Sequence, residues 1–293
     1  MTNYKIPIAF ITVIIIWSST PLAIQWSSVS APMSSVMIRM LVGMLFCLAI
    51  MGLMGLRLPF DQHARRLYVV GGLSIYAAMV LVYTAAQSIP SGWIAVVFGL
   101  SPLITGVIAA FIEPESRLTL IRTTGITLGI MGLYMVFQAG LVYDPGSLLA
   151  IILMIIAAFV SSASSVLIRY LSKDNQYHPM QITTGGLVVA IPFFILTAYL
   201  LEPTVISAFS NKALISILYL GTIGTGIGFT LYYFLLKHVP ASKVALITLI
   251  TPISSLVIGN LLNNEPLFNE IWLGATLVSL GLLLYQFFPL KNK

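Results

Sequence analysis

The sequence has few charges and a single cysteine, and both shortages exclude whole classes of protein. Only 8% of its 293 residues are charged, about a third of the share in a typical soluble domain. The one cysteine, Cys47, has no partner in the chain for a disulfide or a thiolate metal site. We therefore expect neither redox chemistry nor a separate aqueous domain.

Acidic residues are missing from the middle of the apolar segments. Glu113, Glu115 and Glu265 stand at segment ends, where we expect solvated caps. An exporter that exchanges protons for cationic drugs needs a buried carboxylate, so a permanently cationic substrate is not expected. The sequence also lacks a P-loop for ATP and a grouped nucleophile and base. We expect no enzyme activity, no catalytic residues, no metal and no cofactor.

Long apolar segments make up most of the chain. Hydrophobic residues account for 59% of it, and the mean hydropathy is +1.03. About 20 helical residues cross a bilayer core of about 30 Å. Ten segments have this length: 6–26, 33–56, 67–87, 92–112, 118–138, 147–168, 180–201, 213–236, 244–262 and 268–288. The first follows Lys5 as a signal peptide would, but it lacks a convincing cleavage site, so we expect a retained span.

Lysine and arginine are distributed unequally between the two sides of these segments. Twelve of the fourteen lie either near the two termini or in every second connection between segments. The other connections hold only Lys212, and Arg39 lies within the second segment. Positively charged loops stay cytoplasmic, so both termini should be cytoplasmic in a bacterial inner membrane. The charge of +6 is dispersed, so no nucleic-acid partner is expected.

An internal repeat with an offset of 150 residues divides the chain into halves. Five pairs match without gaps: Gly71 and Gly221, Tyr83 and Tyr233, Pro90 and Pro240, Pro102 and Pro252, and Glu115 and Glu265. Each half, 1–141 and 142–293, holds five spans, and an odd number inverts the second half relative to the first. The predicted fold is an all-α membrane bundle of ten transmembrane helices, one transporter-like domain of two inverted five-helix repeats.

Polar side chains recur at helical spacing inside several segments. Segment 213–236 carries such a stripe, and segment 67–87 carries a sparser one. A polar side chain in lipid belongs at a helix contact or in a water-filled cavity, and close packing of small residues is the alternative explanation. From these two segments we select four candidates for substrate contact: Tyr76, Tyr83, Thr225 and Tyr233.

Two prolines lie near the middle of matched segments. Pro102 and Pro252 each remove a backbone donor and free a carbonyl, which is tolerated where a cavity or neighbour supplies the missing partner. We predict that both act as hinges around a central cavity that Thr251 faces, and a simple kink is the alternative.

Three further residues are candidates for the substrate path. Arg39 is the only ionised residue well inside a span, about 9 Å from its outer end. We consider two positions for its side chain. It either faces the cavity and pairs with a carboxylate or phosphate of the substrate, or it extends to the outer interface. Trp17 and Ser162 lie in aromatic and hydroxyl clusters that interrupt aliphatic segments. Such a cluster binds a planar or apolar substrate, or it serves helix packing.

These features together resemble the ten-span drug/metabolite transporter superfamily, and in particular its EamA family. The likeness covers the full length. It is carried by the repeated unit from a mid-helix proline to an acidic turn, which runs from Pro102 to Glu115 and from Pro252 to Glu265, and by Trp17-Ser18 and Arg39. Ser18 replaces the family's usual glycine. The first acidic turn, at 113–116, has one extra residue.

The resemblance implies transport, and the residues leave the cargo open. We predict a monomeric secondary transporter in the lipid bilayer, an exporter or exchanger of small metabolites such as amino acids, working by alternating access. Spans one, three, four, six, eight and nine should line its cavity. The alternative cargo is a nucleobase, a nucleoside or a neutral drug-like compound. A membrane receptor or scaffold is the non-transport alternative.

Overall fold

The computed structural model is a helical bundle that describes residues 4–112, 119–172, 177–202, 209–239, 244 and 246–287. No strand occurs within these residues. The helices are α1 (Lys5–Ser28), α2 (Pro32–Leu53), α3 (Gln62–Ala85), α4 (Ser91–Phe98), α5 (Ser101–Ile112), α6 (Leu120–Tyr143), α7 (Pro145–Leu171), α8 (Pro179–Leu201), α9 (Asn211–Tyr219), the π-helical segment η2 (Leu220–Ile227), α10 (Gly228–His238), α12 (Leu246–Asn263) and α13 (Asn269–Phe287).

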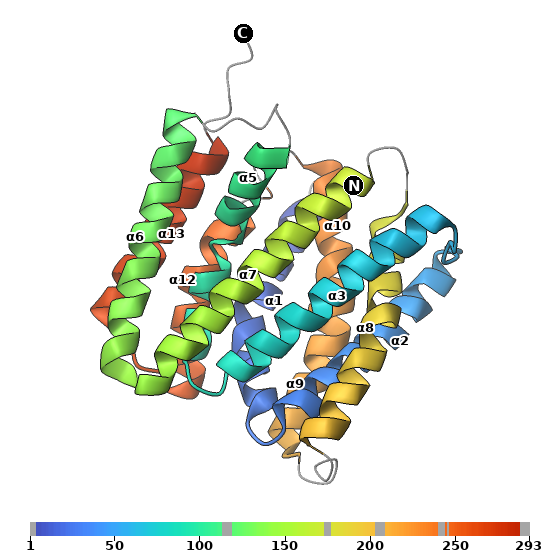
Figure 1. Ribbon diagram of the computed structural model, residues 1–293, viewed down its shortest axis with the longest axis horizontal. Coiled ribbons are helices and arrows are strands. Elements are labelled where there is room, and N and C mark those ends of the chain that lie inside the picture. The colour runs from blue at the N-terminus through green and yellow to red at the C-terminus, as the bar shows by residue number, and fades with distance from the viewer. Residues whose placement is uncertain are drawn as a thin grey trace.

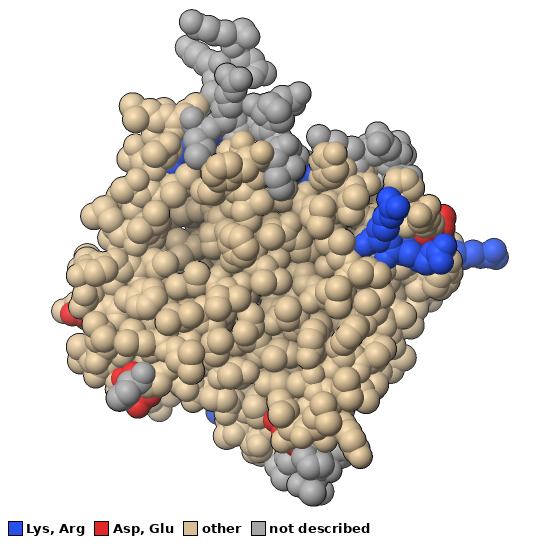
Figure 2. Space-filling view, in the orientation of Figure 1, with Lys and Arg blue, Asp and Glu red and all other residues tan. Residues whose placement is uncertain are grey.

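The helices have the length and composition of membrane spans. Within the described ranges, nine runs are long and apolar enough to cross a bilayer, with α4 and α5 forming one run and α9 continuing into α10 as another. They coincide with the first nine predicted segments, and α13, with 19 residues, occupies the tenth. Figure 2 shows charged side chains only near the rims of the face in view, with an uncharged band between them.

Two of the chain's few acidic side chains cap the starts of α2 and α3. Asp61 accepts hydrogen bonds from the backbone of His63 and Ala64 at the start of α3. Glu202, at the end of α8, accepts from the N–H groups of Met33 (3.0 Å) and Ser34 (2.8 Å) at the start of α2. A carboxylate satisfies the free donors and the positive dipole end of a helix, so these contacts fix where α2 and α3 begin.

The fourth predicted span is broken in its middle. α4 ends at Phe98, a turn follows at Gly99 and Leu100, and α5 begins at Ser101. Pro102 is therefore the second residue of α5, where a missing N–H costs no helical hydrogen bond. Pro102 thus directly follows a break in its span, whereas Pro252 lies inside the continuous helix α12.

The eighth predicted span also departs from a regular helix. Its middle, Leu220–Ile227, is π-helical, and the Thr225 hydroxyl donates to the Leu220 carbonyl five residues earlier at 2.9 Å. A π-helical turn holds more residues than an α-helical turn. The polar stripe predicted at α-helical spacing therefore does not stay on one face of this span.

Two helices from corresponding places in the two halves form one edge of the bundle, α6 and α13, while α2 and α8 lie at the opposite edge (Figure 1). A Cβ atom on Gly125 would lie 2.6 Å from the Gly281 carbonyl oxygen, and one on Gly132 would lie 2.7 Å from the Gly274 carbonyl oxygen. The first contact joins the start of α6 to the end of α13, and the second comes later in α6 and earlier in α13. The two helices therefore run antiparallel, with their backbones nearly touching.

Candidate functional site

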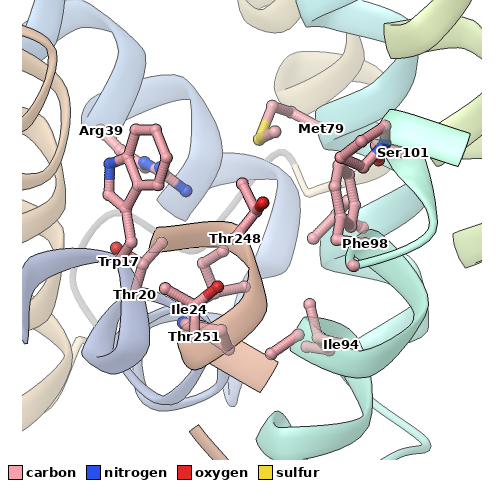
Figure 3. Close-up of a pocket in the computed structure, with 15 residues that line it drawn as sticks. Trp17, Thr20, Ile24, Arg39, Met79, Ile94, Phe98, Ser101, Thr248 and Thr251 are labelled. Carbon is pink, nitrogen blue, oxygen red and sulfur yellow. The ribbon is translucent and has the colours of Figure 1, made fainter. Parts of the chain in front are cut away.

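A cavity of about 330 Å³ lies between α1, α2, α3, α4, α5 and α12 (Figure 3). Its size falls within the range of small-molecule sites, about 300–1,000 Å³. The lining residues are Trp17, Thr20, Pro21, Ile24, Arg39, Met79, Val82, Ile94, Ala95, Phe98, Gly99, Ser101, Pro102, Thr248 and Thr251. Since α12 belongs to the second half of the sequence and the other five helices to the first, both halves contribute to the wall.

Most of the cavity wall is apolar, with hydroxyl groups at a few places. Figure 3 shows Trp17 and Arg39 together on one side, Phe98 and Ser101 on the other, and Thr248 between them. The Ser101 hydroxyl is buried and has no hydrogen-bond partner. A few polar groups on an apolar wall are typical of a site that orients a small amphipathic ligand.

Arg39 supplies the positive charge of the cavity. It is only 7% exposed, and one terminal nitrogen, Nη1, donates to the Tyr83 hydroxyl at 3.3 Å. Its guanidinium lies 5.9 Å from the centre of the Tyr83 ring, and its Nε is buried without a partner. The alternative that Arg39 extends to the outer interface is wrong, because the side chain lines the cavity instead.

Tyr83 lies behind Arg39 and does not line the cavity. Its side chain is fully buried, and its hydroxyl also receives a hydrogen bond from Ser27 at 3.4 Å. The Ser35 hydroxyl donates in turn to the Ser27 carbonyl. A chain of hydrogen bonds from α1, α2 and α3 thus orients the Arg39 guanidinium, so Tyr83 positions Arg39 rather than facing the cavity.

Trp17 and Thr251 are predicted residues that do line the cavity. Trp17 also packs against Tyr232 of α10, with 4.9 Å between ring centres, so its orientation is fixed from outside. Pro102 lines the cavity as well. Pro252 is buried behind the wall, and its Cγ would lie 3.1 Å from a Cβ atom on Gly99. The two prolines therefore flank the break between α4 and α5.

Three predicted residues serve helix contacts instead of the cavity. The Tyr76 hydroxyl lies 2.7 Å from the Thr197 hydroxyl, and its ring packs against Phe194. Ser162 donates to the Ser101 carbonyl at 3.0 Å, and Thr225 bonds within its own π-helical turn. Tyr233 belongs to α10, but its side chain is outside the described part of the structure. Among the described side chains, none of span six or span eight lines this cavity, while span two does through Arg39.

A buried carboxylate that the sequence did not predict lies where the end of α12 meets the start of α4. Glu265 is 6% exposed, so the expectation of a solvated cap is wrong. It accepts hydrogen bonds from the Ser91 hydroxyl (2.9 Å), the Gly92 N–H (3.3 Å) and the Asn263 amide (3.0 Å). The carboxylate thus joins the end of α12 to the start of α4, where the free N–H groups favour a negative charge.

The polar contacts continue from Glu265 to α1. The Asn263 amide also donates to Gln25 at 3.1 Å, and its oxygen accepts from the Trp26 indole at 2.9 Å. Gln25 donates to the Ile89 carbonyl at 3.3 Å. We call Gln25, Trp26, Ser91, Asn263 and Glu265 the Glu265 network. Gln25 directly follows Ile24 in α1, and Ser91 lies about one turn before Ile94 in α4. Both isoleucines line the cavity, so the network is connected to the cavity wall through α1 and α4. The matched Glu115 and Glu265 were the only signal for it in the sequence.

Comparison with known proteins identifies what this arrangement is similar to. A family model described as the EamA-like transporter family matches residues 5–138 and 148–287. An uncharacterized transporter of Bacillus subtilis strain 168, YoaV, is 23% identical over 97% of both chains. An Escherichia coli K12 protein named "Probable amino-acid metabolite efflux pump" is 25% identical over 74% of this chain and 75% of its own.

The fold has also been seen in a solved structure. A protein crystal structure superposes with a TM-score of 0.67 and covers 96% of each chain at 18% sequence identity. At this identity the likeness concerns the fold alone.

Proposed function

Because the chain belongs to the EamA-like transporter family, we propose that it is a secondary transporter that moves a small metabolite by alternating access, as an exporter or exchanger. The observation that carries this proposal is the cavity between α1, α2, α3, α4, α5 and α12, to which both halves of the sequence contribute. In inverted-repeat transporters the substrate site lies at the interface of the repeats. The family and its relatives favour a transporter over an enzyme, and over a receptor or scaffold.

The proposed architecture has ten spans in two inverted halves, residues 1–141 and 142–293. The antiparallel pairing of α6 with α13, the last helices of the two halves, supports this inversion. A second pair of contacts also supports it: α2 packs against η2, and α8 packs against α3. These contacts are equivalent, because α2 and α8 are the second spans of their halves and α3 and η2 belong to the third spans. We further propose a monomer in the bacterial inner membrane with both termini in the cytoplasm, supported by the distribution of lysine and arginine.

Amino acids and related metabolites are the leading substrate class. The name of the Escherichia coli relative supports this class, as does a cavity whose volume suits a molecule of this size. The aromatic side chains Trp17 and Phe98 on opposite sides of the cavity favour a second class, nucleobases, nucleosides and neutral drug-like compounds.

Counterflow in proteoliposomes tests the proposed function. Vesicles with the purified protein, loaded with one unlabelled compound, are expected to accumulate the labelled compound well above protein-free vesicles. A panel of amino acids, nucleosides and neutral drugs, each tested against itself, identifies the class. Absence of counterflow for the whole panel, with the protein shown to be inserted and folded, would contradict transport.

The proposed hinge at Pro102 and Pro252 has its own expected result. Replacing both with alanine restores backbone donors next to the break between α4 and α5, and we expect counterflow to slow by about tenfold, which corresponds to about 1.4 kcal/mol in the barrier. Pro192→Ala is the matched control, because Pro192 lies inside α8 on the exposed surface, away from the cavity. Equal rates in the double variant and the control would exclude the hinge.

A further inference from the structure

The cavity contains a buried positive charge that the structure leaves largely unsatisfied. Arg39 has five N–H donors in its guanidinium, and its hydrogen bond to Tyr83 uses one nitrogen. Its Nε is buried without a partner, and the side chain as a whole is more than nine-tenths buried while it lines the cavity. A buried charge in a membrane protein is costly unless an opposite charge or water meets it.

No acidic side chain of the surrounding helices offers that opposite charge. The six helices around the cavity, α1 to α5 and α12, contain no Asp or Glu at all, and their other basic residues lie in the first turns of α1 and α3. None of the described residues that line the cavity is acidic. Two described acids lie close in sequence to these helices, and both already have partners. Asp61, just before α3, is exposed and accepts from the backbone of His63 and Ala64, and the Glu265 carboxylate is bound to Ser91, Gly92 and Asn263.

The other residues of the cavity wall indicate which chemical groups the anionic ligand carries besides its negative charge. Opposite Arg39 lie Phe98 and Ser101 (Figure 3), and Ile24, Met79 and Val82 complete an apolar surface. A guanidinium binds a carboxylate through paired N–H donors, and the aromatic and aliphatic surface binds an apolar body. The described residues of the wall include no carboxylate for an ammonium group, so a second, positive charge on the ligand would have no opposite charge there.

On the basis of the proposed transport function, we propose that the substrate is a monoanionic carboxylate with an aromatic or branched apolar body, held at its carboxylate by Arg39. Among the amino acids and related metabolites proposed above, the cavity then favours organic acids and N-blocked amino acids over free zwitterionic amino acids. It favours zwitterionic amino acids over amines. Tyr83 is the positioning residue that orients the guanidinium. This ranking goes further than the substrate class, because it orders molecules of the same size and shape by their charge.

Four compounds with the same phenyl body and different charge test the ranking. Phenylpyruvate is an anion, phenylalanine a zwitterion, phenethylamine a cation and 3-phenylpropionamide is neutral. Each compound is added as an inhibitor of counterflow of the labelled substrate that the panel identifies. We expect phenylpyruvate to inhibit at a concentration about tenfold lower than phenylalanine, and phenethylamine to inhibit least. If all four inhibit equally, the anion site is wrong although transport stands; if no compound in this or the wider panel is exchanged, the transport function itself fails.

Variants of Arg39 test whether this residue carries the preference. Arg39→Gln is expected to raise the inhibitory concentration of phenylpyruvate by more than about tenfold and leave that of 3-phenylpropionamide unchanged, while Arg39→Lys keeps part of the preference. Arg66→Gln, which removes an exposed charge at the start of α3, is the matched control. An equal loss for the anion and the neutral amide would overturn the proposal. If Arg39→Gln does not fold, the ranking in the unmodified protein decides.

A lipid headgroup is the other source of an anion for Arg39. The ranking is therefore measured in vesicles of zwitterionic lipid alone and again with anionic phospholipid added. We expect the same order in both. If the preference for phenylpyruvate disappears when anionic lipid is present, Arg39 binds headgroups and the substrate site is excluded.

Discussion

Transport by a Thr251→Cys variant is expected to fall by at least about tenfold, equivalent to about 1.4 kcal/mol, after reaction with a methanethiosulfonate reagent. Thr251 lines the cavity next to Pro252 of α12, so the added group would occupy space that the substrate needs. The background is simple, because Cys47 is the single cysteine of the chain and can be replaced by serine. Counterflow before and after labelling measures the effect.

The control for this experiment is a cysteine outside the cavity. Gln62 is exposed in the first turn of α3, where water reaches a thiolate, so labelling a Gln62→Cys variant should leave counterflow unchanged. Excess substrate should also slow the labelling of Thr251→Cys and have no effect on the labelling of Gln62→Cys. Full labelling of Thr251→Cys with undiminished counterflow would mean that the cavity is not on the substrate path.

A Gly132→Ala variant is expected to be less stable by about 1–3 kcal/mol, the usual cost of inserting atoms into a packed contact. The new Cβ atom would lie 2.7 Å from the Gly274 carbonyl oxygen, 2.8 Å from Val278 Cγ2 and 3.0 Å from the Val278 nitrogen. Two of these three atoms belong to the backbone of α13, so the helices have to separate. The apparent melting temperature of the purified protein in detergent measures the change.

Gly52→Ala is the matched control and is expected to have the opposite sign or no effect. Gly52 lies in α2, and a Cβ atom there would meet nothing within 4 Å. Alanine is the better helix former by about 1 kcal/mol, so this variant should melt at the same or a slightly higher temperature. If both variants melt at the same temperature, the close approach of α6 and α13 does not contribute to stability.

Much of the bundle could be predicted from the sequence, because the bilayer imposes its thickness on every span. The predicted segments 33–56 and 180–201 correspond closely to α2 and α8. The break between α4 and α5 is less evident, since Gly99 and Pro102 are equally compatible with a bend. The π-helical segment η2 packs closely against α2 at Gly221, where a Cβ atom would lie 3.0 Å from the Arg39 carbonyl oxygen. Contacts of that kind are set by tertiary packing, which a single sequence does not reveal.

The candidate site was harder to predict than the fold. Helical spacing groups polar residues on one face of a helix but does not say which neighbour that face meets. Tyr76 and Ser162 were selected on their spacing and surroundings, and both bond to neighbouring helices instead. Arg39 and Trp17 were better candidates because a charge and a large amphipathic ring need specific surroundings in lipid. The burial of Glu265 depends on Ser91 and Gly92, 174 and 173 residues earlier, a distance that no local pattern spans.

The Glu265 network also determines how that end of the protein would open. Every bond across it joins polar groups, among them Gln25, Asn263 and Glu265, and water entering the gap can take over each of these partners. Separation of the network would therefore leave its donors and acceptors hydrogen-bonded to water. Because water can replace the contacts between these amides and the carboxylate, the closed and separated forms of the network should differ only modestly in free energy. Under the alternating access proposed above, such a balance would let this end open and close repeatedly.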